Sequence, residues 1–441
     1  MSQTIAQKII ARAAGLTAVR VGELVIAKVD LAMMHDSGGP RRIAPMLAEL
    51  GVGIWDTSKV VLVSDHFVPA VDQESANILK LTRDFAQSAN IVRFHDMQGI
   101  CHVVLTEQGY VLPGMFCVGG DSHSPTAGAF GCFMFGVGAT EMAGVLATGE
   151  IWIKVPETQA IIWNNNLRPG VVAKDMMLAT LKRLGLRQLN YGIAQYMGEA
   201  VRNLPMHERM VLSNMSAELG AQTGIVEADA ATFAALSAAG VNMDDAPHFH
   251  GDLDAHYAAT WEFDAATLAP QVAVPHSPDN VFDVTEVAPT RVHQAYIGAC
   301  TGAKISDLRM AAAVLKGRKV AAGVRLLVAP ASIAMMAQAV REGTMAAITD
   351  AGAIILPTGC GACAGYGAGI LADDEVCIAS TARNFKGRMG AASASVYLAS
   401  PYTVAASAVA GYVSDPRGML KTPVDRASTA TQSSLESLEK A

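Results

Sequence analysis

The chain has 441 residues, a formal net charge of −7, and a composition that is 51% hydrophobic but only 6% aromatic. One hydrophobic core rarely serves so long a chain, so two or three domains are expected. The acidic balance excludes the basic surface that a nucleic acid or an anionic membrane requires, and neither partner is predicted. The abundance of small residues, including 40 glycines, favours an α/β fold with helices packed on buried parallel strands.

The N-terminal stretch as far as Gly15 carries Lys8 and Arg12 in a helical pattern, and it is predicted to be the first helix rather than an organellar presequence. A second stretch, Met389–Ser414, is uncharged and long enough to span a bilayer, yet its Ser, Gly and Pro401 leave it weakly hydrophobic. We expect this stretch to pack inside a globular core. Seven cysteines without a secretory signal indicate reduced thiols and a cytoplasmic protein.

Three apolar runs are predicted to be buried strands, and each is followed by polar residues. They are Val60–Val63 before Asp65 and His66, Met115–Val118 before the triplet Asp121–Ser122–His123, and Ala295–Gly298 before Cys300. Ligands of open α/β sheets bind beyond the carboxyl ends of the strands, where loops present polar groups without disturbing the core. The loops after these runs are therefore predicted to line a candidate cleft.

The composition changes after Gly240, where Asp, His and Pro become frequent, and a linker is predicted to end near Glu286. Residues 1–285 are then expected to form two closely associated α/β domains, and residues 286–427 a third one. The segment 428–441 is rich in Ser, Thr and Glu with few large apolar residues, and it is predicted to be a flexible tail.

Cys360 and Cys363 lie three positions apart in a glycine-rich loop, and Cys300 lies in a glycine-containing loop far upstream. A CxxC pair alone is compatible with a redox pair, half of a zinc site, part of an iron-sulfur site or two small buried thiols. The crowded glycines allow the backbone to approach something bulky, as a cluster is. Structural zinc needs four ligands, and the sequence has no second CxxC to complete the set.

Three thiolates without an obvious fourth favour a cubic cluster with one iron open to water or substrate, although the spacing alone leaves the zinc and redox interpretations open. The other four cysteines lie in apolar segments and are predicted to act as small core hydrophobes. They are Cys101, Cys117, Cys132 and Cys377.

Five separated stretches make the chain resemble the aconitase superfamily, in particular its separate large subunits of the isopropylmalate isomerase and homoaconitase type. They are GICHVVLTEQGYVLPGMFCVGGDSHSPTAGAFG at Gly99–Gly131, IGACTGAKISDLRMAAAVLKGRKVA at Ile297–Ala321, TGCGACAG at Thr358–Gly365, STARNFKGRMG at Ser380–Gly390 and YLASPYTVAASAVAG at Tyr397–Gly411. The resemblance implies three α/β domains with mainly parallel sheets flanked by helices, without the swivelling fourth domain of the family. It also implies a [4Fe-4S] cluster and the reversible elimination and addition of water.

By this resemblance the cluster ligands are Cys300, Cys360 and Cys363, which leave one iron without a cysteine ligand. The catalytic positions of the family match Asp65, His66, His102, Asp121, His123 and Glu218. Its substrate-binding positions match His35, Ser122, Asn214, Arg383 and Arg388. Asn214 and Glu218 are four positions apart, so on a helix they share one face.

Elementary chemistry agrees with these roles. A carboxylate beside an imidazole, as in Asp65–His66, orients and charges a group that can protonate a departing hydroxyl. Guanidinium forks such as those of Arg383 and Arg388 hold carboxylates in a fixed orientation. Taken alone, each residue also has an ordinary interpretation: a buried structural histidine, a helix cap in Asp121–His123, a solvated Glu218 or a surface arginine.

The chain departs from the family pattern at two places near the expected cluster. Gly302 and Ala382 stand where the family commonly has asparagine, so the sequence does not decide which hydroxy acid is the substrate. The family's catalytic base, a serine near an arginine in the swivelling domain, has no counterpart in this sequence. The resemblance therefore implies a small-subunit partner that supplies that domain and its serine.

The expected protein is the large subunit of a hydro-lyase acting on a small hydroxy-polycarboxylic acid, with 3-isopropylmalate dehydration in leucine biosynthesis as the first candidate. Homoaconitate and methyl-substituted malates or maleates are alternative substrates. A non-catalytic cluster- or zinc-binding regulatory protein is the alternative of another class, favoured slightly by Gly302 and Ala382. A thiol redox protein using Cys360 and Cys363 would leave the histidines, carboxylates and arginines unexplained.

Overall fold

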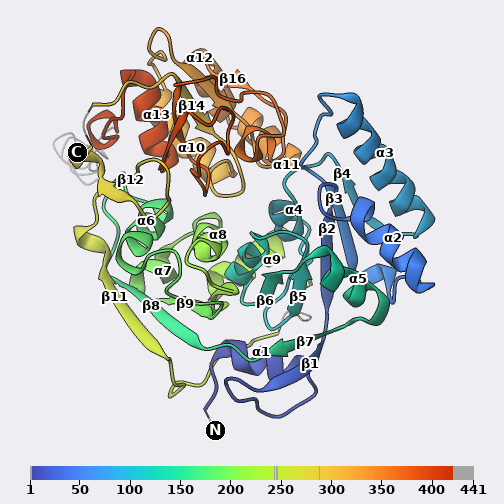
Figure 1. Cartoon of the computed structure of the whole chain (residues 1–441). Coiled ribbons are helices and arrows are strands. Elements are labelled where there is room, and N and C mark those ends of the chain that lie inside the picture. Colours follow the sequence, from blue (N-terminus) through green and yellow to red (C-terminus); the bar gives the residue numbers. More distant parts are fainter. Residues whose placement is uncertain (1, 243, 245–246, 288, 421–441) are drawn as a thin grey trace, which may run out of the picture.

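The computed structural model describes residues 2–420 apart from 243, 245–246 and 288. Within that part of the chain it contains three sheets of four or more strands, each built mainly from parallel strands and flanked by helices (Figure 1). The expected α/β class with parallel sheets is therefore confirmed. The three sheet regions surround helix α8 (Met206–Asn214) near the middle of the molecule (Figure 1).

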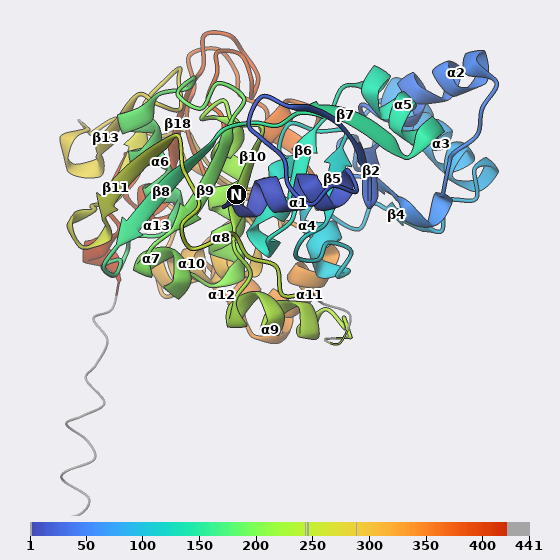
Figure 2. The same ribbon diagram turned by 90° about the horizontal axis from the view of Figure 1, so that it is seen from below.

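The first helix is α1 (Ile5–Ala13), as predicted. It begins at a capping box, in which the Thr4 hydroxyl accepts the Gln7 backbone N–H and the Gln7 side chain accepts the Thr4 backbone N–H. A two-stranded antiparallel ribbon of β1 (Leu24–Lys28) and β7 (Glu150–Lys154) lies beside it (Figure 2). These elements border the first two sheets at the N-terminal end of the molecule.

The first sheet has the strand order β4-β3-β2-β5-β6 and is parallel throughout. Its strands are β2 (Leu31–His35), β3 (Val60–Ser64), β4 (Arg93–Asp96), β5 (Phe116–Gly119) and β6 (Phe133–Gly136), and its helices are α2 (Pro40–Leu50), α3 (Gln73–Ser88), α4 (Cys101–Glu107) and α5 (Ala139–Thr148). Helices α2, α3 and α5 lie on its outer side, and α4 lies toward the rest of the molecule (Figures 1 and 2). Because both faces are covered, every residue of β2 and β3 is buried. The two strands predicted in this region are confirmed.

The second sheet has the order β10-β9-β8-β11 and is also parallel throughout. Its strands are β8 (Thr158–Asn164), β9 (Ile193–Met197), β10 (Thr223–Val226) and β11 (Ala259–Asp264), and its helices are α6 (Ala173–Leu184), α7 (Glu199–Asn203), α8 and α9 (Ala230–Ala238). Trp163 and Tyr196 are almost completely buried in its core. The second sheet thus has an apolar core, and α8 packs on it.

The third sheet has the order β13-β12-β18-β17-β14-β15-β16. Its strands are β12 (Gln271–Ala273), β13 (Val281–Asp283), β14 (Gln294–Ile297), β15 (Arg325–Val328), β16 (Ile354–Ile355), β17 (Val376–Ala379) and β18 (Ser395–Ala399), and its helices are α10 (Ile305–Leu315), α11 (Ile333–Arg341), α12 (Thr344–Asp350) and α13 (Pro401–Ala410). Strands β14 to β18 are parallel, whereas β12 pairs antiparallel with both of its neighbours. The strand predicted before Cys300 is confirmed as β14.

The segment predicted as a linker is partly regular structure. It contains β11, β12 and β13, and β12 pairs with β18 of the third sheet. The linker prediction is wrong in this respect. Strands β12 and β13 have three residues each, which leaves too short a hydrophobic pattern to detect, and the six residues of β11 alternate between partly buried and exposed, so they form no apolar run. The third sheet takes strands from both sides of residue 286, so the division into 1–285 and 286–427 stays a prediction. The predicted tail, 428–441, lies outside the described residues.

No helix in the described part of the chain is both long and apolar enough to cross a membrane. The uncharged stretch Met389–Ser414 forms β18 and α13 instead, and the small side chains of α13 are buried. The prediction that this stretch packs inside the core is confirmed.

A short 3₁₀ segment, η2 (Ser124–Phe130), joins the first two sheets, and all of its residues are buried. A Cβ atom at Gly128 would lie 1.9 Å from the carbonyl oxygen of Gly224, so the backbone of η2 rests directly on β10. Since η2 follows directly on Asp121–Ser122–His123, this contact holds the triplet against the second sheet.

Five ionisable side chains are nearly inaccessible where α6 and α8 meet the start of α10. They are Lys174, Asp175, Glu208, Lys304 and Asp307. The Lys304 ammonium lies 2.9 Å from the Asp307 carboxylate, and the Glu208 carboxylate accepts the backbone N–H of Ala173. Buried charges are tolerated only when they are paired in this way. The junction between the second and third sheets therefore contains buried polar contacts, which fix how the two sheets pack together.

Asp175 in this cluster makes stability depend on pH. Burial raises its pKa to about 7, although the backbone N–H groups of Gln271 and Val172 oppose the shift. The folded state then keeps a proton that the unfolded state loses above about pH 4, so this contribution is lost as the pH rises to about 7. Relative to Asp175→Asn, the wild-type chain is expected to lose on the order of 2–3 kcal/mol of unfolding free energy between pH 5 and pH 8.

Denaturant unfolding followed by tryptophan fluorescence at the two pH values measures this difference. Asp84→Asn, which changes an exposed aspartate of α3, is the matched control and is expected to follow the wild-type profile. Parallel pH profiles for wild type and Asp175→Asn would contradict the prediction.

Candidate active site

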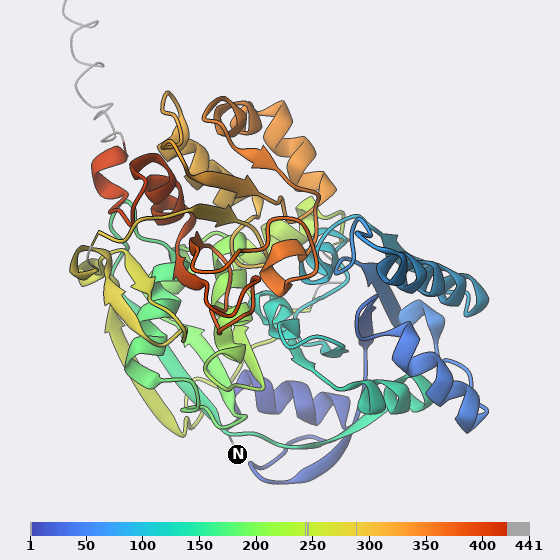
Figure 3. The ribbon, with the colours of Figure 1, turned by 45° about the horizontal axis from the view of Figure 1, so that its top comes forward.

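The loops after β3 and β5 of the first sheet meet the loops after β14, β16 and β17 of the third sheet, and the end of α8 lies beside them (Figures 1 and 3). Hydrogen bonds join these loops across the boundary, from Cys360 to Asp65 and from Arg383 to Ser122. The carboxyl ends of the strands thus form one polar space, as the sequence predicts.

Asp65 and His66 form a hydrogen-bonded pair directly after β3. Asp65 Oδ1 lies 2.7 Å from His66 Nδ1, and a second carboxylate oxygen, Asp36 Oδ1, lies 3.6 Å from the same nitrogen. Burial alone would lower the pKa of His66, but the charges of Cys360 and Asp65 raise it well above its usual value. The imidazole is therefore equipped to carry a proton.

Asp36 is a site residue that the sequence analysis did not single out. It is fully buried, and its carboxylate accepts the backbone N–H groups of Ser37 and of Asp65–Phe67. It thereby shapes the turn that presents the Asp65–His66 pair. The only feature of the sequence that could have identified Asp36 is its position beside His35 at the end of an apolar strand.

Asp65 also ties the first sheet to the cysteine loop. Its Oδ2 accepts the Cys101 backbone N–H at 2.7 Å, and its backbone carbonyl accepts the Cys360 N–H at 2.8 Å. Gly359 has a φ of 144°, and a Cβ atom there would lie 2.7 Å from the Asp65 carbonyl oxygen. Only glycine allows this close approach of the two loops.

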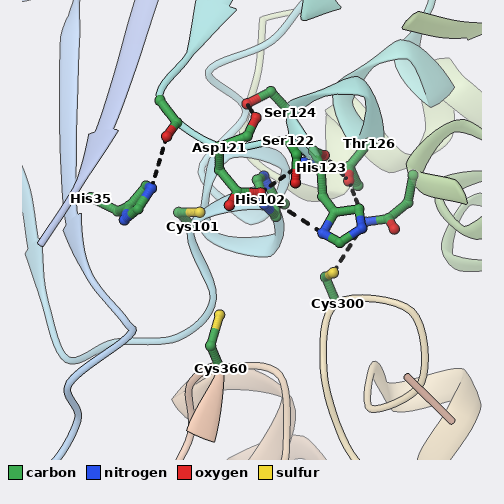
Figure 4. A network of polar contacts seen from close by, with 12 residues as sticks. His35, Cys101, His102, Asp121, Ser122, His123, Ser124, Thr126, Cys300 and Cys360 are labelled. Atoms are coloured by element: carbon green, nitrogen blue, oxygen red, sulfur yellow. Dashed lines mark hydrogen bonds and ion pairs between the residues drawn. The ribbon is translucent and has the colours of Figure 1, made fainter. Parts of the chain in front are cut away.

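Asp121 connects two other predicted histidines (Figure 4). Its Oδ1 lies 2.8 Å from His102 Nε2 and 3.8 Å from His123 Nδ1, and it accepts the His123 backbone N–H at 2.7 Å. Burial would raise the pKa of Asp121, but the hydrogen bond and charge of His102 hold it well below its usual range. The ionised carboxylate fixes the orientation of the His102 ring.

Glu218 joins the triplet of the first sheet to the arginine loop of the third. It follows a 3₁₀ turn, η3 (Met215–Ala217), at the end of α8. Its Oε1 lies 3.1 Å from His123 Nε2 and accepts Arg383 Nε–H at 2.7 Å. Burial opposes the shift, but His123 and Arg383 lower the pKa of Glu218. Arg383 also donates to Ser122 Oγ at 3.0 Å, at the exposed edge of the site.

Asn214, the last residue of α8, brings an amide to a cysteine sulfur. Its Nδ2 donates to Thr126 Oγ1 at 2.7 Å and to Cys300 Sγ at 3.1 Å. Thr126 in turn donates to the carbonyl oxygen of His123 at 2.6 Å. The expected approach of Asn214 and Glu218 to one site is thus observed, with Thr126 as a further link.

The three predicted cysteine ligands border this network as free thiols. Cys300 and Cys363 are each 8% exposed, and Cys360 is half-buried. Figure 4 shows the sulfurs of Cys300 and Cys360 pointing into the space below His102 and Asp121. Burial and the charge of Cys363 raise the pKa of Cys300 to about 12, so a metal would have to displace its proton on binding.

The spacing of the candidate ligands distinguishes a site for a single metal ion from a site for an iron-sulfur cluster. In the described residues, two groups have ligand atoms all within 4.8 Å of one another, namely His35–Asp36–Asp65–His66 and His102–Asp121–His123. Neither group contains a cysteine. The three cysteines are therefore too far apart to enclose one zinc ion, whereas a cluster offers a separate iron to each thiolate.

Several buried polar atoms around the space have no hydrogen-bond partner in the part of the chain described. They are His35 Nδ1, His102 Nδ1, Asn214 Oδ1 and Glu218 Oε2, and Arg388 Nε in the arginine loop is unpaired as well. Buried polar atoms are normally paired, so these atoms are free to bind a ligand that the described chain does not include. Thiols suit iron and guanidinium groups suit carboxylates, so the residues present fit both an iron-sulfur cluster and an acidic substrate.

His35 lies at the rim of the same space, and Arg388 belongs to a loop that begins there. His35 Nε2 is 3.0 Å from the Gly120 carbonyl oxygen, and its ring stacks on that of His66 with centroids 4.2 Å apart. Burial, followed by the charge of His66, lowers the pKa of His35. Arg388 shares the loop between β17 and β18 with Arg383. All fourteen predicted site residues therefore lie on loops or element ends, and Arg388 is placed only by the loop that it shares with Arg383.

The structure explains one departure from the family pattern. A Cβ atom at Gly302 would lie 2.1 Å from Ser380 Oγ, so an asparagine could not stand there unless Ser380 moved.

Lys174, which the sequence analysis missed, donates to Thr301 Oγ1 at 3.2 Å and to the Thr381 carbonyl oxygen at 2.8 Å. A lysine within an apolar helical pattern is the signal that marks it. Nothing in the structure explains Ala382.

The remaining four cysteines are fully buried, as predicted for core residues. Cys101 belongs to the core around Ile100 and Val103, and Figure 4 shows that its sulfur also lies close to the site. Its place at the start of α4 follows from the hydrogen bond between its backbone N–H and Asp65.

The sequence pattern of the aconitase family (aconitate hydratase) matches residues 7–411. The chain belongs to the aconitase family. The resemblance noted in five separate stretches is thereby confirmed, and the family implies a [4Fe-4S] cluster. The loops described above are the parts of this family member that bring together cysteines, imidazoles and arginines.

Named relatives agree with this membership. The 3-isopropylmalate dehydratase large subunit 1 of Methanopyrus kandleri is 43% identical and covers 95% of this chain and 100% of its own length. The large subunit of the same name from Moorella thermoacetica is 42% identical, covering 96% of this chain and 100% of its own length. The methanogen homoaconitase large subunit of Methanocaldococcus jannaschii is 42% identical, and the match covers 93% of this chain and 99% of that subunit's length.

Proposed function

We propose that the chain is the large subunit of a hydro-lyase of the 3-isopropylmalate dehydratase type, acting on a small hydroxy-polycarboxylic acid. The names of the relatives from Methanopyrus kandleri and Moorella thermoacetica support this substrate. The observation that carries the proposal is the meeting of three free cysteines with two imidazole–carboxylate pairs and Arg383 in one space. A cytoplasmic location agrees with all seven cysteines being free.

Cys300, Cys360 and Cys363 would hold the [4Fe-4S] cluster and leave one iron without a cysteine ligand. When bound, such a cluster supplies a Lewis acid that polarises the C–O bond of a hydroxy acid. Asn214 would hydrogen-bond to one of the cluster's thiolates, as it does to Cys300 Sγ, and the unpaired buried oxygen of Glu218 would be free to accept a hydrogen bond from a bound water or substrate.

Arg383 and Arg388 are proposed to bind the carboxylates of the substrate. Glu218 and Ser122 hold Arg383 in one orientation, and Arg388 has a buried Nε–H without a partner in the described chain. Two guanidinium groups, of which Arg383 is already held in place, would orient a dicarboxylic acid and so remove part of the entropic cost of elimination. A cavity of about 420 Å³ opens beside Ser122 and Arg383 and gives access to them.

His66 is proposed to give a proton to the departing hydroxyl, because two carboxylates, Asp65 and Asp36, hold its Nδ1 side and favour its charged form. His102 is oriented by Asp121 through Nε2, which leaves Nδ1 for a hydrogen bond to the substrate. When water is added in the reverse direction, the same imidazoles would accept protons.

The base that removes the carbon-bound proton is proposed to come from another chain. No counterpart of the family's serine motif stands in this sequence, and the relatives are themselves named as large subunits. A small subunit that presents a serine over the open cavity would complete the site. The site described here would then contain the binding groups and the acid, but not the base.

Homoaconitate is the second candidate substrate, because a relative named as a homoaconitase large subunit is almost as similar as the dehydratases. The same arginines and imidazoles would serve either acid. A non-catalytic cluster- or zinc-binding protein is less well supported, since it gives no reason for the unpaired Arg388 and Glu218 atoms.

The first test is anaerobic reconstitution with iron and sulfide. The chain alone is expected to bind an iron-sulfur cluster, with broad visible absorbance, yet to turn over isopropylmalate very slowly. Addition of the co-expressed small subunit is expected to restore activity. Binding of zinc without the visible absorbance of an iron-sulfur cluster, or full activity of the chain by itself, would contradict the proposal. Turnover of homocitrate, measured beside that of isopropylmalate, would decide between the two substrates.

A further inference from the structure

Tyr296 carries a buried hydroxyl that has no hydrogen-bond partner among the described residues. The side chain belongs to β14 and is 0% exposed. Buried tyrosines normally pair their O–H, because an unpaired polar group inside a protein is costly. The unpaired hydroxyl therefore indicates a partner that is not part of the described chain.

Two glycines show where the hydroxyl lies. A Cβ atom at Gly298 would stand 2.4 Å from the Tyr296 oxygen, and one at Gly361 would stand 3.8 Å from it. Gly298 closely precedes Cys300, and Gly361 lies between Cys360 and Cys363. The hydroxyl thus lies between the two loops that carry the cysteines.

The electrostatic surroundings give the same location. Burial, followed by the charges of Cys363 and Cys360, raises the pKa of Tyr296 well above its usual value. The backbone N–H of Cys363 acts on the same oxygen in the opposite direction. Such a contact uses only a lone pair of the oxygen and leaves the phenol proton without an acceptor.

We propose that the Tyr296 hydroxyl donates a hydrogen bond to a sulfur of the iron-sulfur centre at the Cys360–Cys363 loop. This inference rests on the proposed function, in which these cysteines hold the cluster. Tyr296 is a positioning residue here, because it acts on the centre and does not touch the substrate. A hydrogen bond to sulfur stabilises the more negative, reduced form and raises the reduction potential.

Tyr296→Phe removes the one hydroxyl and keeps the ring. In the anaerobically reconstituted chain, this variant is expected to keep its iron and sulfide content and to be harder to reduce by roughly tenfold, which is about 59 mV for a one-electron couple. A dye-mediated redox titration measures the potential. Resonance Raman spectra are expected to show a shift of the iron-thiolate stretching bands.

Tyr196→Phe is the matched control. Tyr196 is 2% exposed, but its hydroxyl already pairs with Ser216 Oγ at 2.8 Å. Loss of this hydroxyl is expected to leave the potential and the Raman bands unchanged. A natively folded Tyr296→Phe that loses its iron, while Tyr196→Phe retains it, would also support a bond to the centre.

A Tyr296→Phe variant with a full cluster, the wild-type potential and unchanged Raman bands would overturn the inference and leave the proposed function standing. A wild-type chain that takes up no iron and sulfide would overturn both. The two failures are distinguished by the iron and sulfide analysis of the wild-type chain.

Discussion

Cys363→Ala is expected to abolish the visible absorbance of the reconstituted chain and, with the small subunit present, to reduce its hydro-lyase activity to background. Three thiolates hold the proposed cluster, and the structure offers no fourth cysteine in the loop to replace one of them. Because each thiolate would bind a different iron, loss of one leaves an exposed, labile centre. Iron and sulfide content, absorbance and turnover are the measurements.

Cys377→Ala is the matched control for this prediction. Cys377 is fully buried in β17 of the same sheet, so its removal deletes the same thiol without changing the cysteine loops. This control is expected to keep iron, sulfide and turnover. A Cys363→Ala chain that retained a full complement of iron and its activity would show that the cluster is held elsewhere.

Glu218→Gln is expected to lower kcat by roughly 10²–10⁴-fold while the cluster is retained. In the wild type, one carboxylate oxygen serves both His123 and Arg383, and the other is buried and unpaired toward the site. The amide keeps the volume but loses the charge that orders both partners. Steady-state kinetics of the two-subunit enzyme, together with iron analysis, tests the prediction.

Glu208→Gln provides the control, since Glu208 is also a buried glutamate and belongs to α8. Burial and the charge of Asp307 raise its pKa, so the neutral amide resembles its natural state more closely. We expect kcat near the wild-type value for this variant. An unchanged kcat in Glu218→Gln would remove that residue from the proposed machinery.

The strands that carry the site were predictable because their sequences are simple. Val60–Val63 and Ala295–Gly298 are continuous apolar runs, as expected when helices cover both faces of a parallel sheet. The three-residue strands β12 and β13 were not predictable, because their pairing depends on β18, a distant segment. Short strands of this kind take their structure from the tertiary contacts around them.

The identity of the candidate site residues was carried by local motifs, whereas their mutual arrangement was not. The pairing of Glu218 with Arg383, and of Asn214 with Cys300, joins segments that no local pattern relates. Asp36 and Tyr296 escaped prediction for the same reason. Their importance follows from what surrounds a carboxylate or a hydroxyl after folding, and not from the residue type.

The sequence by itself determined the α/β class, the family, the three candidate cysteines and the imidazole, carboxylate and arginine positions. Those properties depend on residue type, spacing and hydrophobic period, which are local and readable along the chain. The tertiary structure decided that the three cysteine sulfurs do not enclose a single ion, that Asp65 joins the first sheet to the cysteine loop of the third, and that several buried polar atoms lack partners among the described residues. These properties depend on distances between segments far apart in the chain, which only the packing of the three sheets sets.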